Sequence, residues 1–200
     1  MAERMYMPGA TAIGLVFTEG VILASERRMS YGTFVMSKTA KKLFKITDKI
    51  GVACAGIMSD MQLLAREASY YANIFRFNNN RDITAHALAK LLSNLLFSSR
   101  MFPLLAQTLV GGYDVDKPGV YVLDPVGSVI QDEYAAVGTG AEICLGVLEA
   151  SFKPNMDYEQ SKDLVMKALR AAVERDSGSG NGFDIMAITK KGIVEEFIPA

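Results

Sequence analysis

The sequence has no tryptophan, one histidine and two cysteines among its 200 residues. The one histidine, His86, falls in a helical pattern, so a Ser-His-Asp triad or a histidine-rich metal site has no second candidate. Cys54 and Cys144 lie in apolar surroundings without CxxC spacing, which indicates small buried hydrophobic residues in a reducing compartment. We therefore expect no metal and no histidine-based hydrolase.

The sequence also lacks a charge excess and a long apolar run. Its 21 Lys and Arg residues nearly balance its 22 Asp and Glu residues and are spread along the chain, so no nucleic-acid or membrane surface is predicted. Residues 1–7 carry both charges and no apolar stretch long enough for a signal peptide or a membrane span. These features predict a soluble, cytoplasmic protein.

Half of the residues are apolar, which is ample for one domain with a core of several layers. The first residues are polar and end in Pro8 and Gly9, which precede the first strand-like run. We expect residues 1–10 to form a leader, or propeptide, and residues 11–200 to form the domain.

Short β-branched and apolar runs dominate the first quarter of the chain, and turn residues separate them. Strands are predicted over residues 12–17, 21–25, 34–37, 42–46 and 50–55. Thr18-Glu19-Gly20 joins the first two as a hairpin, and we expect all five strands to form one opening sheet.

Helical spacing of apolar residues then replaces the strand signal. A helix is predicted from a cap at Ser59 or Asp60 to about Phe77, and a second helix over residues 84–100. The remaining elements are predicted as strands over 108–113, 120–123 and 129–132, helices over 141–150 and 158–175, and strands over 184–189 and 193–198. Such segregated runs are typical of α+β proteins. The predicted architecture is a four-layer αββα sandwich with two antiparallel sheets between helix layers.

Two glycine-rich motifs carry little information by themselves. Gly138-Thr139-Gly140 has the form GxG, but Ile143 stands where a dinucleotide fingerprint needs its third glycine, and no βαβ unit surrounds the motif. No nucleotide cofactor, and no other cofactor, is therefore predicted. Residues 176–180 are acidic, hydroxylic and glycine-rich after a long helix, which is typical of a surface loop.

A chain without a usable histidine base can still activate a hydroxyl with the free α-amine of an N-terminal threonine. That amine titrates near about 8 when unperturbed, so a nearby lysine cation favours its neutral, proton-accepting form. Glu26, at the end of the second strand, and Lys42, at the start of another, are charged residues beside buried runs. A surface ion pair is the simpler interpretation of each of them.

Short blocks of residues, in a fixed order along nearly the whole chain, give more specific information about the family. They are Gly14, residues 23–28, Ser37-Lys38 with Lys41-Lys42, Ala55-Gly56, and residues 58–60, 91–96, 109–114, 124–127, 137–140, 146–149 and 175–180 with Asp184. With these blocks the sequence resembles a proteasome β-type subunit in archaeal style, a threonine peptidase of the N-terminal-nucleophile hydrolases. The resemblance implies peptide-bond hydrolysis by an N-terminal threonine.

The resemblance also implies roles for single residues. Thr11 would be the nucleophile, Lys42 would tune its protonation, and Glu26 would hold that lysine charged and oriented. The backbone N–H of Gly56 would donate to the oxyanion, where the missing side chain lets the scissile carbonyl approach.

Further residues are implied around the amine and the substrate. Asp176 and Ser179 would hydrogen-bond around the N-terminal amine, and Thr139 occupies a position where the family usually has serine. The pocket for the residue before the cut would be apolar. Its implied lining is Met29, Ala40, Phe44, Cys54 and Met58.

One position departs from the family pattern. Counting back without gaps from Glu26, Lys42 and Gly56 to the family's catalytic threonine lands on Ala10, and Thr11 is the next residue. Because side chains alternate faces along a strand, Thr11 would point away from Lys42 unless a bulge or a shifted register corrects it. Self-processing is expected at the Ala10–Thr11 bond, since autolysis needs a hydroxyl on the residue after the cleaved bond.

The implied partners are proteasome α subunits and other β subunits in stacked seven-membered rings, a regulatory ATPase acting through the α ring, and unfolded polypeptide substrates. The chain would be a zymogen that processes itself. Two alternatives stay open: a catalytically silent structural β subunit, which Ala10 favours, and another amidohydrolase of the same fold.

Overall fold

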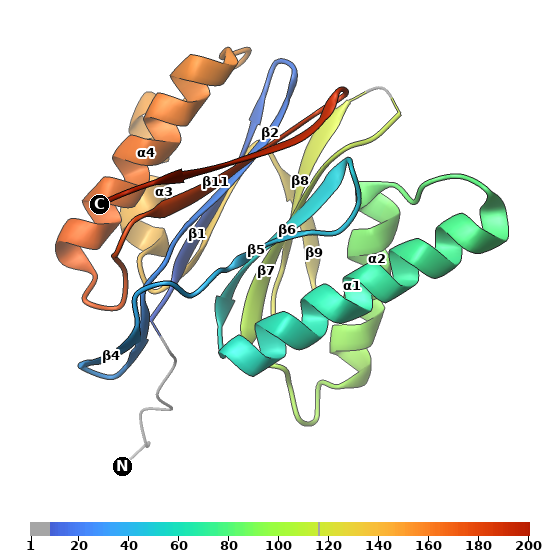
Figure 1. The fold of residues 1–200 in the computed structure, drawn as a ribbon, viewed down its shortest axis with the longest axis horizontal. Helices are drawn as coiled ribbons and strands as arrows, with labels where there is room; N and C mark the ends of the chain where they lie inside the picture. The colour runs from blue at the N-terminus through green and yellow to red at the C-terminus, as the bar shows by residue number, and fades with distance from the viewer. Residues whose placement is uncertain (1–8, 116) are drawn as a thin grey trace.

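The computed structural model describes residues 9–115 and 117–200, and the first eight residues of the predicted leader lie outside these ranges. Helices α3 (Ala141–Ser151) and α4 (Tyr158–Arg175) form one outer layer, and helices α1 (Met58–Asn79) and α2 (Ala85–Ser98) form the other. Two sheets lie between them (Figure 1). The predicted four-layer αββα sandwich is confirmed.

Each of the two central sheets has five strands, and every neighbouring pair is antiparallel. The first has the order β10-β1-β2-β11-β12, with β10 Tyr134–Gly138, β1 Thr11–Phe17, β2 Gly20–Glu26, β11 Phe183–Thr189 and β12 Gly192–Ile198. The second has the order β5-β6-β7-β8-β9, with β5 Leu43–Lys45, β6 Ile50–Gly56, β7 Ala106–Tyr113, β8 Pro118–Leu123 and β9 Val129–Asp132. A separate ribbon pairs β3 (Met29–Tyr31) with β4 (Phe34–Ser37).

The prediction of one opening sheet is wrong. The hairpin β1–β2 belongs to the first sheet, β5 and β6 belong to the second, and β4 lies in the ribbon. Every residue of β2 is buried, and its second edge pairs with the distant strand β11. Nearness in sequence fixes hairpins, whereas burial on both faces and pairing at both edges require partners from elsewhere in the chain.

Three local details also differ from the sequence prediction. Strands β3 and β10 were not predicted, because one is only three residues long and the other contains Ala135-Ala136, a weak strand signal. Helix α1 begins after Ile57 without a side-chain cap. The predicted cap residue Asp60 instead accepts a hydrogen bond from the backbone N–H of Leu105 at 2.8 Å, which ties the helix start to the start of β7.

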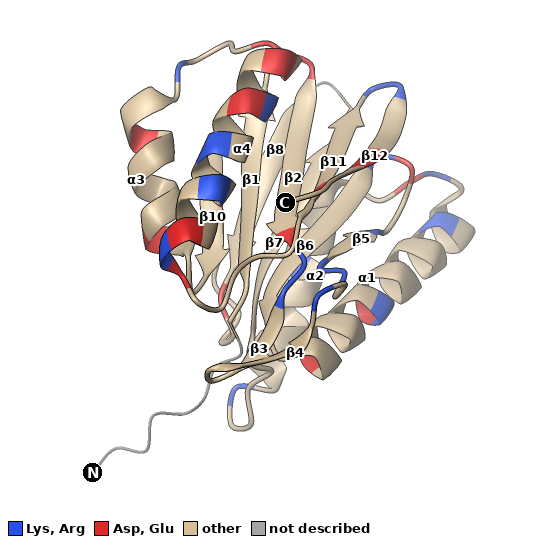
Figure 2. Cartoon of the chain, turned by 60° about the vertical axis from the view of Figure 1, so that its left-hand side comes forward, with Lys and Arg blue, Asp and Glu red and all other residues tan. Residues whose placement is uncertain are grey.

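The two sheets approach each other closely in the core between them. A Cβ on Gly111 would lie 2.9 Å from Leu23 Cδ2 and from Val21 Cγ1, so the glycine lets β7 pack directly on β2. Many of the charged residues lie on the helices and in loops (Figure 2). Among the described residues, the helices are too short or too polar to cross a membrane.

Leu23→Ala is expected to destabilise the domain, because Leu23 is fully buried in the layer between the sheets. Removing it leaves a cavity that the two sheets cannot close, at a cost of about 2–5 kcal/mol in the free energy of unfolding. Urea denaturation of the variant measures this cost. Val194→Ala, an exposed position on β12, is the control and should change the free energy by less than about 0.5 kcal/mol.

Candidate active site

β1 belongs to the first sheet, and its start lies at one end of the sandwich (Figure 1). Ala10 and Ala12 pack in the core between the sheets, whereas Ile13 and Leu15 pack in the core under α3 and α4. Since side chains alternate along a strand, Thr11 points toward the helix layer. Its pairing with β2 and β10 runs without a register shift. No bulge turns Thr11 toward the second sheet.

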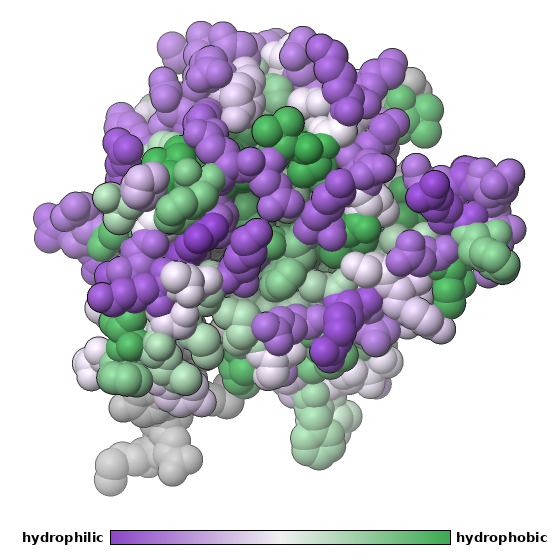
Figure 3. Space-filling model, viewed as in Figure 1, coloured by the Kyte–Doolittle hydropathy of each residue, from purple (hydrophilic) through white to green (hydrophobic). Residues whose placement is uncertain are grey.

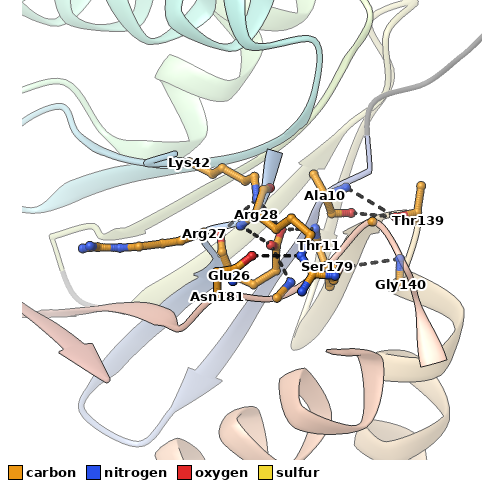
Figure 4. A network of polar contacts seen from close by, with 12 residues as sticks. Ala10, Thr11, Glu26, Arg27, Arg28, Lys42, Thr139, Gly140, Ser179 and Asn181 are labelled. Carbon is orange, nitrogen blue, oxygen red and sulfur yellow. Dashed lines mark hydrogen bonds and ion pairs between the residues drawn. The ribbon is translucent and has the colours of Figure 1, made fainter. Parts of the chain in front are cut away.

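The contacts of Thr11 agree with this direction. Its hydroxyl is fully buried, lies 2.7 Å from Ser179 Oγ and accepts a 3.0 Å hydrogen bond from the backbone N–H of Gly140. Figure 4 shows Gly140 and Lys42 on opposite sides of this group. Within the part of the chain that the structure describes, the Thr11 hydroxyl makes no hydrogen bond to Lys42.

The buried carboxylate of Glu26 collects four donors. Oε1 accepts from the backbone N–H of Thr11 at 3.0 Å and from the Lys42 ammonium. Oε2 accepts from the backbone N–H groups of Arg28 at 2.6 Å and Gly180 at 2.9 Å. Lys42 Nζ also donates to the carbonyl oxygens of Glu26 at 3.0 Å and Arg28 at 2.5 Å. The predicted pairing of Lys42 with Glu26 is present, and the pair is saturated with hydrogen bonds.

Burial shifts the protonation equilibria of this pair. Desolvation raises the pKa of Glu26 above its ordinary value, and the Lys42 cation opposes the shift. Desolvation lowers the pKa of Lys42, and the Glu26 carboxylate opposes that shift. Each group therefore holds its charge mainly because of the other, so removal of either one leaves an uncompensated buried charge.

The loop after α4 adds a second carboxylate. Asp176 Oδ2 accepts from Thr139 Oγ1 at 2.5 Å and from Ser179 Oγ at 2.7 Å. Its Oδ1 accepts from the backbone N–H of Gly178 at 3.0 Å. Three predicted site residues, Asp176, Ser179 and Thr139, thus meet in one hydrogen-bonded group.

Arg28 holds this loop in place and was not among the predicted site residues. Its Nε donates to Asn181 Oδ1 at 2.9 Å, and its Nη1 donates to the carbonyl oxygen of Ser177 at 3.0 Å. The sequence signal was its position two residues after Glu26. Which loop it reaches depends on contacts about 150 residues away along the chain, and only the fold supplies them.

Ala10 lies next to this hydrogen-bonded group, and its side chain packs in the core between the two sheets. Its backbone N–H donates to Thr139 Oγ1 at 3.3 Å, and its carbonyl oxygen accepts from the backbone N–H of Thr139 at 2.8 Å. It packs in one cluster with Leu43 and Ala55 of the second sheet, and Leu43 directly follows Lys42. Figure 4 shows Ala10 between Lys42 and Thr139, so the residue at this place carries a methyl group and no hydroxyl.

Gly56 ends β6 beside this group. Its φ of +145° is rarely adopted by other residues, and a Cβ there would lie 2.1 Å from the carbonyl oxygen of Leu105. Glycine is required at this position. A cavity of about 150 Å³ lies between Gly56 and Ala106 on one side and Gly138 and Thr139 on the other.

The predicted substrate pocket is brought together in part. Cys54, Phe44 and Met58 pack in one cluster. Met29 lies in the ribbon strand β3, and the backbone N–H of Ala40 donates to the carbonyl oxygen of Arg27 beside the Glu26 and Lys42 pair. Burial raises the pKa of the Cys54 thiol to about 12, so this cysteine is a packing residue and not a nucleophile.

Comparison with known proteins identifies the family. A family model described as "Proteasome subunit" matches residues 7–188. The chain is 53% identical to "Proteasome subunit beta 1" of Nitrosopumilus maritimus over 96% of each chain. It is 49% identical to the protein of that name in Cenarchaeum symbiosum, over 94% of this chain and 97% of the relative. For the one in Ignicoccus hospitalis the identity is 45%, over 90% of this chain and 91% of the relative. With this fold and these relatives, the chain belongs to the proteasome family as a β-type subunit.

Proposed function

We propose that this chain is a structural β subunit of the proteasome core particle that does not cut peptide bonds itself. The observation that carries the proposal is Ala10, which lies between Lys42 and Thr139 where the catalytic hydroxyl would be needed (Figure 4). Proteolysis would then depend on another β subunit of the same particle. The remaining polar residues keep the geometry of the site without its nucleophile.

The surroundings of Thr11 support the same conclusion. Its backbone nitrogen lies 3.0 Å from Glu26 Oε1, so an amine freed there by cleavage would be held as an ammonium ion. An ammonium ion cannot accept the proton of the hydroxyl. The hydroxyl itself is buried and already bonded to Ser179 and Gly140, on the side of β1 away from Lys42.

A second candidate function is threonine-type endopeptidase activity of the chain itself, with Thr11 as the nucleophile. The observation that favours it is a chain of hydrogen bonds from Thr11 Oγ1 through Ser179 Oγ to Asp176 Oδ2, each 2.7 Å long. Such a chain could take up the proton of the hydroxyl. This mechanism would replace Lys42 by Asp176 as the partner of the nucleophile, and would need cleavage of the Ala10–Thr11 bond, whose carbonyl oxygen is bonded to Thr139.

We further propose the setting in which the subunit works. It would assemble with α subunits and other β subunits in stacked seven-membered rings in the cytoplasm. Unfolded polypeptides would enter under the control of a regulatory ATPase at the α ring. The family match supports assembly with other proteasome subunits, and the near-neutral net charge of −1 fits a chain that is packed against others.

Ala10→Thr is expected to create activity. The new hydroxyl would attack the Gly9 carbonyl, and the amide bond between Gly9 and residue 10 would break as its nitrogen takes up the hydroxyl proton. Water would then hydrolyse the resulting ester, which releases residues 1–9 and leaves a free amine at residue 10. Assembled particles of the variant should lose residues 1–9 by intact mass and hydrolyse a fluorogenic peptide about a thousandfold faster than the parent or more. Particles must contain no other active β subunit.

Thr11→Ala separates the two candidate functions in the same assay. In a non-cutting subunit this change leaves the N-terminal residue of the chain and the background hydrolysis unaltered. If the parent chain instead begins at Thr11 and loses its activity on Thr11→Ala, the chain is an endopeptidase and the proposal of a silent subunit is wrong.

Lys42→Met is expected to destabilise the domain in a pH-dependent way. Without the cation, the folded-state pKa of Glu26 rises further above its unfolded value of 4.5. A carboxyl with a raised pKa contributes stability that is fully present below pH 4.5 and is lost as the pH rises through the folded-state pKa. The loss at neutral pH should reach about 3–5 kcal/mol and should shrink toward pH 5 in urea denaturation.

Two further variants test the cause of this loss. Lys41→Met changes the neighbouring lysine, whose side chain is 60% exposed in a surface ion pair, and should cost less than about 1 kcal/mol at any pH. The double variant Lys42→Met with Glu26→Gln should recover part of the loss, because no buried charge remains. A loss for Lys42→Met that does not vary with pH would contradict this account.

Co-expression with matching α subunits is expected to yield a large stacked-ring particle that contains this chain. The measurement is native mass, which also gives the number of copies per ring. A chain that stays monomeric beside assembled α subunits would contradict the proposed setting.

A further inference from the structure

We propose that a basic groove on one side of this subunit binds an acidic edge on the opposite side of a second copy of the same chain. The basic groove is the groove between β5, α1 and β12. The acidic edge is formed by β9, β10, α3 and the turn before β9, and its carboxylates are Asp124, Asp132, Glu133, Glu142 and Glu149. The proposal rests on the proposed function, because it names the neighbour of this subunit in the proposed ring.

The two surfaces come from segments of opposite charge. Lys and Arg occur along most of the chain, but residues 27–49 contain seven of them and only one acidic residue, Asp48. Residues 118–152 contain five acidic residues and no Lys or Arg. The net charge of −1 therefore conceals a separation of charge within the chain.

The fold places the two surfaces at opposite edges of the sheets. β5 and β12 are edge strands on one side, where Lys41 before β5 pairs with Glu195 of β12 at 3.6 Å. β9 and β10 are the edge strands on the other side, and only Glu133 separates them in the chain. Three strands lie between the two edges of each sheet. The basic groove and the acidic edge therefore cannot meet within one molecule.

The basic groove has a volume of about 600 Å³, and its lining includes three cations, Lys41, Lys45 and Arg66, but one carboxylate, Glu195. Lys41 and Lys45 lie in ion pairs with Glu195 and Asp48, and both lysine side chains are about half exposed. Such surface pairs are weak, so they can exchange for other carboxylates. Within residues 9–115 and 117–200, Arg66 makes no ion pair. The groove therefore has cations available for an acidic partner.

The acidic edge has no cations of its own to pair with. Four of its carboxylates are exposed and the fifth, Asp124, is half-buried. None of the five is in an ion pair in the part of the chain that the structure describes. Figure 2 shows basic segments beside β5 and α1, and acidic segments on α3 at the far side of the picture. Surfaces of opposite sign attract each other and exclude a contact between like surfaces.

Apolar side chains accompany the charges on both surfaces. In the basic groove Leu43 is buried and Phe44 is half-buried. On the acidic edge Val126 is 51% and Ile130 is 56% exposed. Figure 3 shows the face with the groove, where hydrophilic residues surround a paler, weakly apolar area between β12 and α1. An apolar centre with a polar rim is the usual arrangement of a protein interface.

The symmetry of this contact fits the proposed ring. A contact between two different surfaces of the same chain is heterologous, and its repetition around an axis closes a ring. A contact of either surface with itself would instead give a dimer and would bring like charges together.

The test is sedimentation velocity of the full-length chain and of two charge-reversed variants. Lys45→Glu with Arg66→Glu reverses the basic groove, and Asp132→Lys with Glu133→Lys reverses the acidic edge. The parent is expected to self-associate at about 50 mM NaCl and about tenfold more weakly at about 500 mM NaCl. Each variant alone should self-associate about tenfold more weakly than the parent or less, because both of its surfaces then carry the same sign.

An equal mixture of the two variants should recover the association. Each unaltered surface then meets its complement, and the two reversed surfaces also match each other. Lys167→Glu with Arg170→Glu is the control, since it makes the same change of charge at exposed positions of α4. It should leave the association unaltered.

The proposal is wrong if the parent stays monomeric at low salt at every soluble concentration, or if either variant associates as the parent does. It is also wrong if the mixture does not recover while both variants unfold at the temperature of the parent. Peptide hydrolysis is measured separately. Hydrolysis that depends on Thr11 would reject the silent subunit and leave this contact intact, whereas unaltered association of the variants would reject the contact alone.

Discussion

Four hydrogen bonds to the buried carboxylate of Glu26 join the parts of the molecule on which its site depends. They come from the first residue of β1, from Lys42 before β5, from the backbone after β2, and from Gly180 in the loop after α4. One charge thereby links both sheets and the loop that carries Asp176. A carboxylate removed from water is stable only when its lone pairs are filled in this way, so these segments are held in one arrangement.

In the same arrangement, the residues that hold the site together are distinct from the residue at the expected nucleophile position. Lys42 is held by Glu26 and by backbone carbonyl oxygens, and Asp176 holds Thr139 and Ser179. Ala10 contributes only backbone contacts, which reach the Thr139 hydroxyl. The scaffold can therefore persist when the nucleophile position is alanine. In the proposed structural subunit, such a scaffold would stabilise the fold without a nucleophile.

Much of the fold could be predicted from the sequence because it depends on local patterns. Hydrophobic periodicity located the four helices, and segregated strand and helix runs gave the layers. The pairing of strands could not be predicted in the same way. β2 has β11 as a neighbour about 160 residues later along the chain, and the small strand β10 forms only because β1 offers it a free edge.

For the site, the residue types and the family were determined by the sequence alone, including the alanine at the position where the resemblance implies the nucleophile. Whether Thr11 could act in place of Ala10 depended on the direction in which the Thr11 side chain points. The answer depends on the regular register of β1 between β2 and β10, since a single bulge would have turned the hydroxyl toward Lys42. The contacts of Arg28 with the loop after α4 and the cavity beside Gly56 likewise arise from residues far apart in sequence. Only tertiary packing brings such groups together, because a sequence pattern specifies the face of an element but not its neighbour.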